Sequence, residues 1–381
     1  MSDVPVSMVS YVPLALAAFL VALVSVALLV PQVRRFAHRV QAVQIGGASH
    51  GRGHRQHDGA IPNIGGIAIL AGFLVALVVG SVLAPELLDA YRVELLAIVL
   101  GASLMALVGF IDDIWEVPAA MRLASQFLAA GILVVNGVTI DFITNYFGDG
   151  AYVFMPEVLA VALTLLWVVG FTNAFNFIDG VDGLSSGIAA IASLSLLAVA
   201  LQFVDRGASV LILAALAGAA LGFLRHNFNP ATITMGDSGA YLFGYVLAAV
   251  SVLGALKVTA AVTVVAPVLI LALPVVNITQ VTVRRLRRGV NPAVAANDHL
   301  HDILRHRSGS PRVTVYVLWS ATLVLGVLGM LLSQTPPVLL AGTVVAAVLL
   351  IALVSYLRLR EVADEARGVL AAVVGDDTAP R

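Results

Sequence analysis

The residues best suited to chemistry in this chain are acidic and amide side chains at the borders of long apolar stretches. Four polar groups interrupt those stretches: Asp112-Asp113, the run 173–182, the segment 227–237 and His299-Leu-His301. Carboxylates beside a bilayer are costly and therefore mark functional candidates. Hard oxygen ligands suit Mg²⁺, which usually takes one or two protein ligands together with substrate phosphates and water. The pattern predicts a single polar site that is rich in oxygen ligands.

The composition is that of an integral membrane protein. Of the 381 residues, 60% are hydrophobic and only 11% are charged, whereas a soluble domain is about 25% charged. The chain contains no cysteine, which excludes disulfides and thiolate metal sites. The first apolar run is longer than the core of a signal peptide and follows no basic region, so we expect a transmembrane helix there.

Long apolar runs predict an all-α polytopic fold, because about 20 apolar residues suffice to cross the hydrocarbon layer. About eleven transmembrane helices are expected, at 8–30, 61–83, 93–111, 122–140, 154–172, 183–203, 207–224, 238–256, 259–283, 313–333 and 337–356. Pro274 and Asn277 interrupt the ninth of these spans. We expect residues 1–356 to form one transmembrane catalytic domain and residues 357–381 a cytoplasmic tail. That tail reads either as an amphipathic helix on the inner surface or as a solvated segment.

The distribution of Lys and Arg predicts the orientation. With the N-terminus outside, only Arg92, Arg206 and Lys257 fall on the outer side, and the other 18 of the 21 basic residues fall inside. The C-terminus is then cytoplasmic, and every polar group named above lies in a cytoplasmic segment. The active site is therefore expected at the cytoplasmic face.

Asp112 and Asp113 end the third predicted span. Adjacent residues on a helix point about 100° apart, so the two carboxylates need not act alike. They could bind a divalent metal, hold a cationic partner or terminate the helix at the interface, where acids oppose the helix dipole. Arg122 follows at the start of the fourth span. It is a candidate partner for a phosphate or a carboxylate, with an ordinary interfacial arginine as the alternative.

The run from Asn173 to Leu184 carries two Asn, two Asp and two Gly between two apolar spans. Asn173, Asn176 and Asp179 are spaced three apart, so one helical face could present all three. A polar turn is also rich in these residue types, but it does not need this many acids. The run therefore favours metal or substrate binding.

The segment from Asn227 to Gly239 leads into the eighth span. Asp237 with Ser238 could cap that helix, but a cap does not account for Asn227. A helix N-terminus also favours anions. A metal-binding Asp237 at that point therefore fits phosphate chemistry.

Two basic cytoplasmic segments contain histidines. In the segment 284–312, His299, His301 and Arg305 stand among arginines. A zinc site is poorly supported there, because His-x-His without cysteine lacks nearby ligands, and phosphate recognition by His and Arg fits better. For the His-rich segment 31–60 we favour a mobile, partly solvated loop, with Arg55 and His57 as candidate contributors to the site.

At these motifs the chain resembles the polyprenyl-phosphate N-acetylhexosamine-1-phosphate transferases. That family includes the bacterial undecaprenyl-phosphate GlcNAc-1-phosphate transferases and the phospho-MurNAc-pentapeptide translocase. The resemblance covers about residues 55–310, through Arg55-Gln-His57 with Pro62 and Gly65-Gly66, Gly109-Phe-Ile-Asp-Asp, Arg122-Leu-Ala-Ser-Gln126, Asn173-Ala-Phe-Asn176 to Asp182-Gly-Leu, Met235-Gly-Asp-Ser-Gly, and Arg284-Arg285 to His299-Leu-His301. Each motif is weak alone, but the ordered set is highly specific.

The resemblance implies transfer of a sugar-1-phosphate from a UDP-sugar to a polyprenyl phosphate, with release of UMP. It also implies a requirement for Mg²⁺, with Mn²⁺ as the alternative ion, held by Asp237 and Asn176. The implied catalytic residues are Asp112, Asp113, Arg122, His299 and His301. The implied substrate-binding residues are Arg55, His57, Asn173, Asp179, Asp182, Asn227 and Arg305.

The chain departs from the family pattern at three positions. Glu116 stands where a third Asp is frequent, Asp302 replaces a frequent His, and Asn277 replaces a common Asp. With eleven expected spans and His-Leu-His, the chain is more similar to the GlcNAc-1-phosphate branch than to the translocase branch, which has ten spans and a His-His-His run. We expect GlcNAc-1-phosphate transfer to undecaprenyl phosphate in the bacterial cytoplasmic membrane, with phospho-MurNAc-pentapeptide transfer as the alternative.

Rival functions predict features that this sequence lacks. A secondary transporter predicts acids near mid-membrane and repeated halves, whereas these acids lie at span ends and no repeat is visible. A prenyltransferase predicts a second Asp-rich copy, and a CDP-alcohol phosphotransferase predicts an Asp-Gly-x-x-Ala-Arg run, and both are absent. No nucleic-acid partner is expected, and a homodimer is left open.

Overall fold

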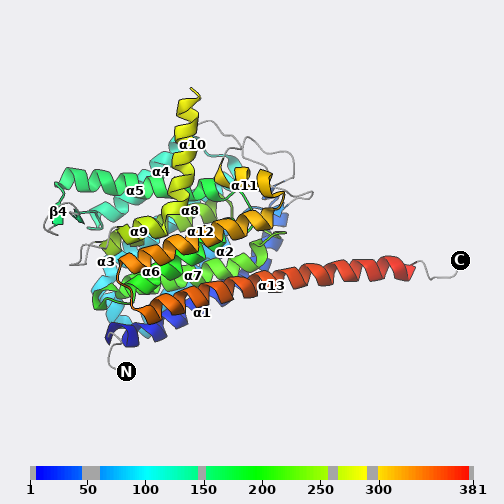
Figure 1. Ribbon diagram of the computed structural model, residues 1–381, viewed down its shortest axis with the longest axis horizontal. Coiled ribbons are helices and arrows are strands. Elements are labelled where there is room, and N and C mark those ends of the chain that lie inside the picture. The colour runs from blue at the N-terminus through cyan, green and yellow to red at the C-terminus, as the bar shows by residue number, and fades with distance from the viewer. Residues whose placement is uncertain (1–5, 45–60, 145–151, 256–264, 290–298, 377–381) are drawn as a thin grey trace.

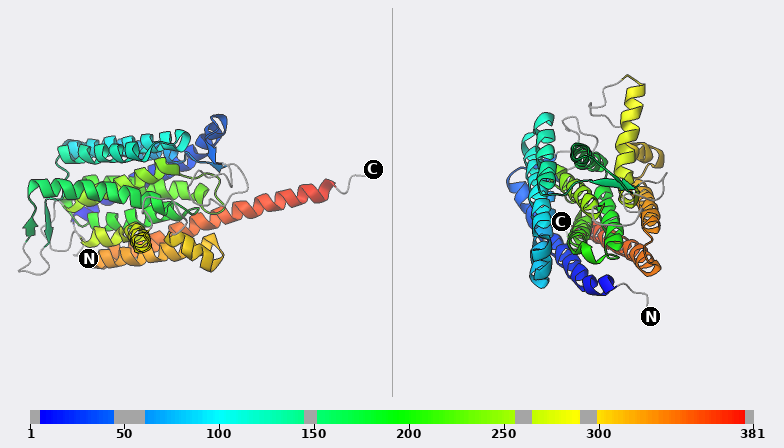
Figure 2. Two further views of the ribbon diagram at one scale, coloured as in Figure 1. Left: turned by 90° about the horizontal axis from the view of Figure 1, so that it is seen from above. Right: turned by 90° about the vertical axis from the view of Figure 1, so that its left-hand side faces the viewer.

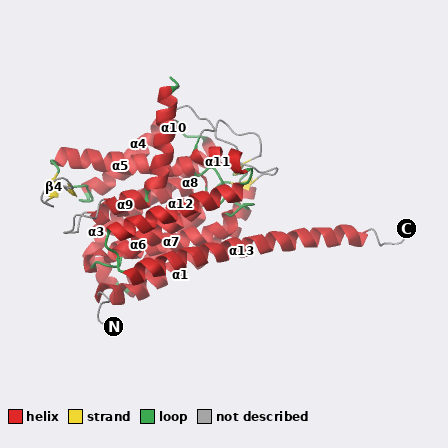
Figure 3. Cartoon of the chain, viewed as in Figure 1, coloured by secondary structure: helices red, strands yellow, loops and turns green. Residues whose placement is uncertain are grey.

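The computed structural model describes residues 6–44, 61–144, 152–255, 265–289 and 299–376. Helices running side by side make up almost all of this part of the chain (Figures 1 and 3). In order along the chain, the elements are α1 (Val6–Arg39), β1 (Val43–Gln44), β2 (Ile61–Pro62), α2 (Gly66–Leu83), α3 (Pro85–Trp115), α4 (Ala119–Val135), β3 (Phe142–Thr144), β4 (Tyr152–Phe154), α5 (Glu157–Ile178), α6 (Leu184–Ala200), the 3₁₀ turn η1 (Val204–Arg206), α7 (Gly207–Asn227), α8 (Gly236–Ala255), α9 (Val265–Ile270), α10 (Ala272–Arg287), α11 (Leu300–Ser308), α12 (Pro311–Leu332) and α13 (Pro337–Asp376). The strands form two short antiparallel pairs, β1 with β2 and β3 with β4.

The helices confirm an all-α, multi-pass membrane protein. Eight of those in the described ranges are long and apolar enough to cross a membrane, namely those within α1, α2, α3, α5, α7, α8, α12 and α13. The helices α4 and α6 are apolar but shorter. Together these ten helices correspond to ten of the eleven predicted spans. The full count of eleven and the orientation remain predictions.

The ninth predicted span, 259–283, is not a single helix in the described residues. The chain forms α9, leaves helical geometry at Leu271 with φ −96° and ψ 9°, and starts again as α10. Pro274 explains the break, because its ring would clash with the carbonyl of residue 270 and it has no N–H to donate. In the first turn of a new helix that N–H is not needed. The second part, α10, stands out from the bundle (Figures 1 and 2).

The centre of the bundle is formed by α7 and α8, whose apolar stretches are buried at every position. The helices α1, α2, α3, α5 and α6 pack around them. By contrast, only 17% of the apolar stretch of α13 is buried, so this helix lies at the periphery. The N-terminus of α8 therefore starts inside the protein, where its backbone N–H groups need protein partners.

Two glycines let neighbouring helices approach the N-terminus of α8. A Cβ at Gly109 of α3 would overlap the backbone of Asp237 and Ser238, and a Cβ at Gly66 of α2 would overlap the backbone of Ser238 and Gly239. Only glycine fits where backbones approach this closely. The helices α2 and α3 thus enclose the first turn of α8.

The helix α13 runs from Pro337 to Asp376 without a break and extends beyond the other helices (Figure 1). It therefore passes through residue 356, where the sequence predicts the end of the membrane domain and the start of a tail. That domain boundary remains a prediction. The polar groups at Asp112-Asp113, Asn176, Asp237 and His299 meet at one end of the bundle, around α8 and the last turn of α5.

Candidate active site

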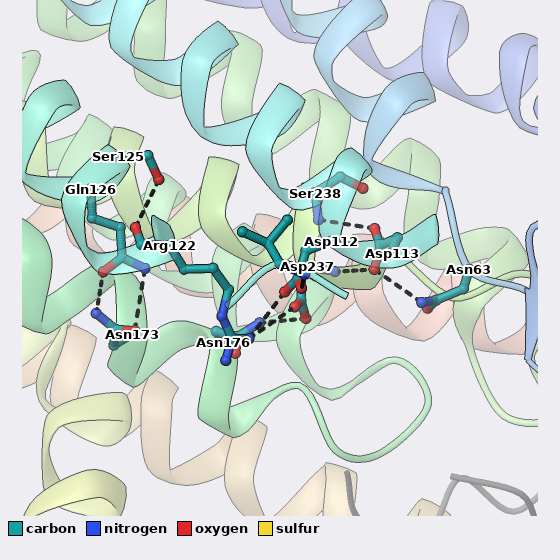
Figure 4. A network of polar contacts seen from close by, with 11 residues as sticks. Asn63, Asp112, Asp113, Arg122, Ser125, Gln126, Asn173, Asn176, Asp237 and Ser238 are labelled. Carbon is teal, nitrogen blue, oxygen red and sulfur yellow. Dashed lines mark hydrogen bonds and ion pairs between the residues drawn. The ribbon is translucent and has the colours of Figure 1, made fainter. Parts of the chain in front are cut away.

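Four polar side chains from four helices meet at the N-terminus of α8 (Figure 4). Nη1 of Arg122 in α4 lies 3.0 Å from Oδ2 of Asp112 in α3 and 3.9 Å from Oδ2 of Asp237 in α8. Asn176, in the last turn of α5, donates from Nδ2 to Oδ1 of Asp237 at 2.9 Å. The structure thus brings together four residues that the sequence predicts to be catalytic or metal-binding.

Both carboxylate oxygens of Asp112 have partners within the protein. Its Oδ2 pairs with Arg122, and its Oδ1 accepts a hydrogen bond from the backbone N–H of Val117 at 2.7 Å. The residue is 3% exposed, and Asp237 is 6% exposed. The guanidinium of Arg122 therefore stands between two buried carboxylates, where charge interactions are stronger than at a water-exposed surface.

Asp113 faces a different direction from Asp112 and binds the N-terminus of α8. Its Oδ1 accepts the backbone N–H of Asp237 at 2.8 Å, and its Oδ2 accepts that of Ser238 at 3.2 Å. Asn63 also donates from Nδ2 to Oδ1 at 3.0 Å. A carboxylate at this position satisfies orphan N–H groups and complements the helix dipole. From the sequence, Asp237 and Ser238 were candidates to cap α8. In the structure, Asp113 of α3 supplies that cap.

This arrangement predicts a structural effect for Asp113. In Asp113→Ala, two helix N–H groups and the Asn63 amide lose their acceptor, so the free energy of unfolding should fall by about 1–3 kcal/mol. Thermal unfolding of the detergent-solubilised protein checks this. Asp113→Asn keeps one oxygen acceptor and should fall between the wild type and Asp113→Ala. An Asp113→Ala protein with the wild-type unfolding midpoint would contradict the capping role.

Asn173 does not share a cluster with Asn176. Its amide makes reciprocal hydrogen bonds with Gln126 of α4, at 2.6 Å and 3.3 Å, and also donates to the carbonyl of Val169. Gln126 is 2% exposed. These bonds join α4 to α5 and so fix the spacing between Arg122 and Asn176.

A small polar cavity lies beside this cluster, at the turn between α5 and α6. It is lined by Asp179, Gly180, Val181, Asp182, Asn227 and Thr234. Asp179 has left the helix, with φ −77° and ψ 59°, so it does not share a helical face with Asn173 and Asn176 as the spacing suggested. Oδ2 of Asp182 accepts bonds from Nδ2 of Asn229 and from the backbone N–H of Ala231.

Asn227 holds the walls of that cavity together. Its Oδ1 accepts the backbone N–H of Gly183 and the hydroxyl of Ser186, both at 3.0 Å, and its Nδ2 donates to the carbonyl of Ile233. It is 3% exposed. The predicted substrate-binding residues Asp179, Asp182 and Asn227 are therefore brought together, and Asn227 mainly binds backbone groups of the cavity wall.

The two predicted histidines reach the same end of the bundle from α11. The His299 ring stacks on Phe177 of α5, with centroids 5.6 Å apart, and on the His301 ring at 5.5 Å. Oδ1 of Asn277 in α10 accepts the backbone N–H of Leu300. The His301 ring fills the space beside Gly180, because a Cβ there would overlap its Nε2. The histidines thus pack against the last turn of α5 and the cavity.

His301 is neutral at pH 7 in this structure, because burial lowers its pKa to about 4. In the unfolded chain the pKa of histidine is about 6.5, so the unfolded state binds more protons between these values. The contribution of His301 to the free energy of unfolding should therefore be constant above about pH 6.5 and fall as the pH drops toward about 4. Unfolding midpoints at several pH values check this. His301→Gln should show a smaller acid-induced drop, and an equal drop would contradict it.

The remaining predicted residues divide into two groups. Arg305 lies on α11 with Nη2 4.0 Å from Oδ1 of Asp302, which also accepts the N–H of His299 through Oδ2. Asp302 thus closes a capping box on α11, a role that accounts for this departure from the family pattern. Arg55 and His57 lie outside the described residues.

Sequence reasoning did not select Asn63, Gln126 or Asn277 as site residues. Asn63 is 7% exposed and Asn277 is fully buried. A polar residue that is buried needs hydrogen-bond partners, and each of these three holds a predicted site residue or its helix. Their signal in the sequence was weak, since a lone amide in an apolar stretch does not show which segment it will meet.

The chain offers oxygen donors for a metal ion, although not a complete cage. Among the described residues, no group of three or more His, Asp or Glu side chains is arranged to hold a metal ion alone. Asp237 offers a carboxylate with the Asn176 amide beside it, and Asp112 lies across Arg122. This donor set fits Mg²⁺, which needs few protein ligands where substrate phosphates and water complete its shell.

Comparison with known proteins finds relatives that match most of this chain. The model for "Glycosyl transferase family 4" matches residues 95–255, from α3 to the end of α8. The chain is 32% identical to a probable undecaprenyl-phosphate N-acetylglucosaminyl 1-phosphate transferase of Bacillus subtilis, over 79% of this chain and 80% of that protein. It is 31% identical to a decaprenyl-phosphate N-acetylglucosaminephosphotransferase of Mycolicibacterium smegmatis, over 84% of each.

A relative from the other branch matches over a shorter stretch. The phospho-N-acetylmuramoyl-pentapeptide-transferase of Shouchella clausii is 32% identical over 62% of this chain and 72% of that protein. The order of the motifs, the meeting of Asp112, Arg122, Asn176 and Asp237, and relatives that cover four fifths of the chain all agree. The chain therefore belongs to the polyprenyl-phosphate N-acetylhexosamine-1-phosphate transferases of glycosyl transferase family 4.

Proposed function

We propose that this protein transfers GlcNAc-1-phosphate from UDP-GlcNAc to undecaprenyl phosphate. An oxygen of the lipid phosphate attacks the β-phosphorus of the UDP-sugar, the bond from that phosphorus to the bridging oxygen breaks, and UMP leaves. The product is a lipid-linked pyrophosphoryl sugar. The names of the relatives that match over most of the chain support this donor and a polyprenyl phosphate acceptor.

The observation that carries the proposal is the Arg122 guanidinium held between Asp112 and Asp237 at the N-terminus of α8. Attack of one phosphate on another is opposed mainly by charge repulsion, so catalysis needs positioning and electrostatic stabilisation. Arg122 supplies fixed positive charge for the reacting phosphates. The Asn63–Asp113–α8 contacts and the Gln126–Asn173 bonds keep it and Asp237 in place.

Asp112 serves to orient Arg122 in this proposal. A phosphate monoester has a second pKa near 6 and is mostly dianionic at neutral pH. Its attack therefore does not require a general base. The two hydrogen bonds that Asp112 accepts, from Arg122 and from the Val117 N–H, suit a carboxylate that positions the guanidinium.

The proposal includes Mg²⁺, with Mn²⁺ as the alternative ion. Asp237 and Asn176 would hold it through a carboxylate oxygen and the amide oxygen, because the Asn176 amide lies against the Asp237 carboxylate at the N-terminus of α8, where its Nδ2 donates to Oδ1. When bound, the ion neutralises charge on the pyrophosphate. His299, His301 and Arg305 would contact phosphate groups from α11. Because His301 is neutral, its imidazole would act as a hydrogen-bond donor and not as a fixed charge.

The surface around the cavity at Asp179, Asp182 and Asn227 is proposed as the nucleotide side of the donor site, since the cavity itself, about 10 Å³, holds no more than one water molecule. Thr234 of its lining donates to Oδ1 of Asn63 at 2.7 Å, and Asn63 in turn binds Asp113. A uridine or ribose offers hydroxyl and imide donors, for which carboxylate and amide oxygens are suitable acceptors. The enzyme is proposed to act at the cytoplasmic face of the bacterial inner membrane, the side on which the distribution of Lys and Arg predicts the site.

Release of UMP by the purified protein tests the proposal. The protein is incubated with Mg²⁺ and undecaprenyl phosphate, and with UDP-GlcNAc, UDP-GalNAc or UDP-MurNAc-pentapeptide as the donor. We expect lipid-dependent UMP release with UDP-GlcNAc alone, and decaprenyl phosphate in a parallel reaction tests the lipid length. Release only with UDP-MurNAc-pentapeptide would assign the translocase reaction. No release with any donor from folded protein would overturn the proposal.

A further inference from the structure

An arginine of the last helix reaches into the protein and binds a loop beside the candidate site. Arg358 of α13 is 5% exposed. Its Nη2 donates to the carbonyl oxygen of Pro230 at 2.9 Å, and its Nε lies 3.3 Å from the same oxygen. The sequence placed this residue in a cytoplasmic tail, where an exposed arginine is expected. Burial with two bonds to one carbonyl indicates a specific contact instead.

A second arginine binds the neighbouring carbonyl. Nε of Arg312, in the first turn of α12, donates to the carbonyl oxygen of Asn229 at 3.3 Å. Arg312 and Arg358 thus hold two consecutive carbonyl groups of the connection between α7 and α8, from two C-terminal helices. We call this pair the arginine clamp, and residues 228–234 the α7–α8 loop.

The α7–α8 loop also binds Asp182, which lines the cavity. Nδ2 of Asn229 donates to Oδ2 of Asp182 at 3.1 Å, and the backbone N–H of Ala231 donates to the same oxygen at 3.2 Å. Further along, Thr234 lines the cavity and binds Asn63. The peptide that the arginine clamp holds is therefore the one whose donors orient Asp182.

An ion-pair chain fixes α13 against α7 at this level. Glu361 lies 2.7 Å from Nη2 of Arg225, at the end of α7, and 3.4 Å from Nη1 of Arg358. Arg225 and Glu361 are partly exposed, so their pair contributes little stability by itself. Its geometric effect is to hold α13 against α7 at the level where Arg358 lies opposite Pro230.

We propose that Arg358 is a positioning residue for donor binding, acting through Pro230 and the α7–α8 loop on Asp182. The inference rests on the proposed function for the identity of the donor. It adds that the last helix, which lies outside the residues 95–255 matched by the family, sets the shape of the nucleotide side. The contacts of Arg358 described above do not include the cluster of Asp112, Arg122, Asn176 and Asp237. Its loss should therefore weaken UDP-sugar binding more than it slows turnover.

The test compares Arg358→Gln with Arg360→Gln. Arg360 lies two residues away on the same helix, its side chain is 66% exposed, and among the described residues it pairs with Asp364, at 4.0 Å. We expect Arg358→Gln to raise the KM for the UDP-sugar about tenfold or more, the effect of losing a charge-assisted hydrogen bond, with kcat changed less than threefold. Arg360→Gln should match the wild type. Arg358→Lys keeps one donor and should recover part of the affinity.

Hydrogen exchange gives a readout that does not depend on activity. Amides of the α7–α8 loop should exchange faster in Arg358→Gln than in Arg360→Gln or the wild type, while those at the centre of α7 remain unchanged. Faster exchange throughout the protein would indicate general unfolding and overturn the proposal. So would a fall in kcat with an unchanged KM, or unchanged exchange in the loop. If the wild type releases no UMP with any donor, the proposed function fails. Hydrogen exchange then still shows whether the arginine clamp orders the α7–α8 loop.

Discussion

Asp237→Ala is expected to lower lipid-dependent UMP release by about a thousandfold or more, because it removes the proposed metal ligand and one charge of the reacting cluster. The protein should remain folded. The contact that caps α8 uses the backbone N–H of residue 237 with Asp113, and alanine keeps that N–H. Initial rates of UMP release with UDP-GlcNAc and undecaprenyl phosphate measure the loss, and thermal unfolding checks the fold.

A matched control distinguishes this loss from a general effect of removing a carboxylate. Asp364 on α13 has a side chain that is 58% exposed and forms only surface ion pairs, so Asp364→Ala should retain full activity. Asp237→Ala with more than a tenth of wild-type activity would remove this residue from the metal site. A large drop in its unfolding midpoint would instead indicate that Asp237 is needed for the fold.

The helices were largely predictable from the sequence, because a bilayer imposes a length on every span. Ten of the predicted spans each correspond to one helix. The span at 259–283 was predicted with an interruption at Pro274 and Asn277, and in the described residues it divides into α9 and α10. The rule that proline interrupts a helix at the preceding turn was the signal for this interruption, although hydropathy, which averages over a window, still counted one span.

The cluster of Asp112, Arg122, Asn176 and Asp237 was predictable as a group because all four stand at span ends on one predicted side. Their division of roles was not. The two neighbouring aspartates were expected to differ in direction, and the structure shows that Asp112 binds Arg122 while Asp113 binds the N-terminus of α8. Which partner each would meet depends on the packing of α3 against α8, and periodicity does not determine that packing.

Contacts between distant segments were the least predictable part of the site. Asn63 meets Asp113 across 50 residues, and Arg358 meets Pro230 across 128. Neither pair carries a local motif, because spacing in the sequence reports only on neighbours within one element. The positive-inside bias accounts for any arginine near a cytoplasmic helix end, so the sequence offers no reason to expect a specific contact for Arg358.

Arg122 should show the second large effect, with a clear difference between two substitutions. Arg122→Gln removes a cation that lies within 4 Å of both Asp112 and Asp237, so the repulsion between the carboxylates and the substrate phosphates increases. We expect kcat to fall about a hundredfold or more. Arg122→Lys restores the charge but not the planar fork of donors, so activity should return to within about tenfold of the wild type.

Steady-state kinetics with both substrates separate these effects. If Arg122 acts on the reacting phosphates, kcat falls in Arg122→Gln and is recovered by lysine, whereas a purely structural arginine would lower the unfolding midpoint equally in both variants. A KM change without a kcat change would place the guanidinium on a substrate group that is bound equally in the ground and transition states. Equal activity of the Arg122→Gln and Arg122→Lys variants would show that the positive charge held between Asp112 and Asp237 does not contribute to catalysis.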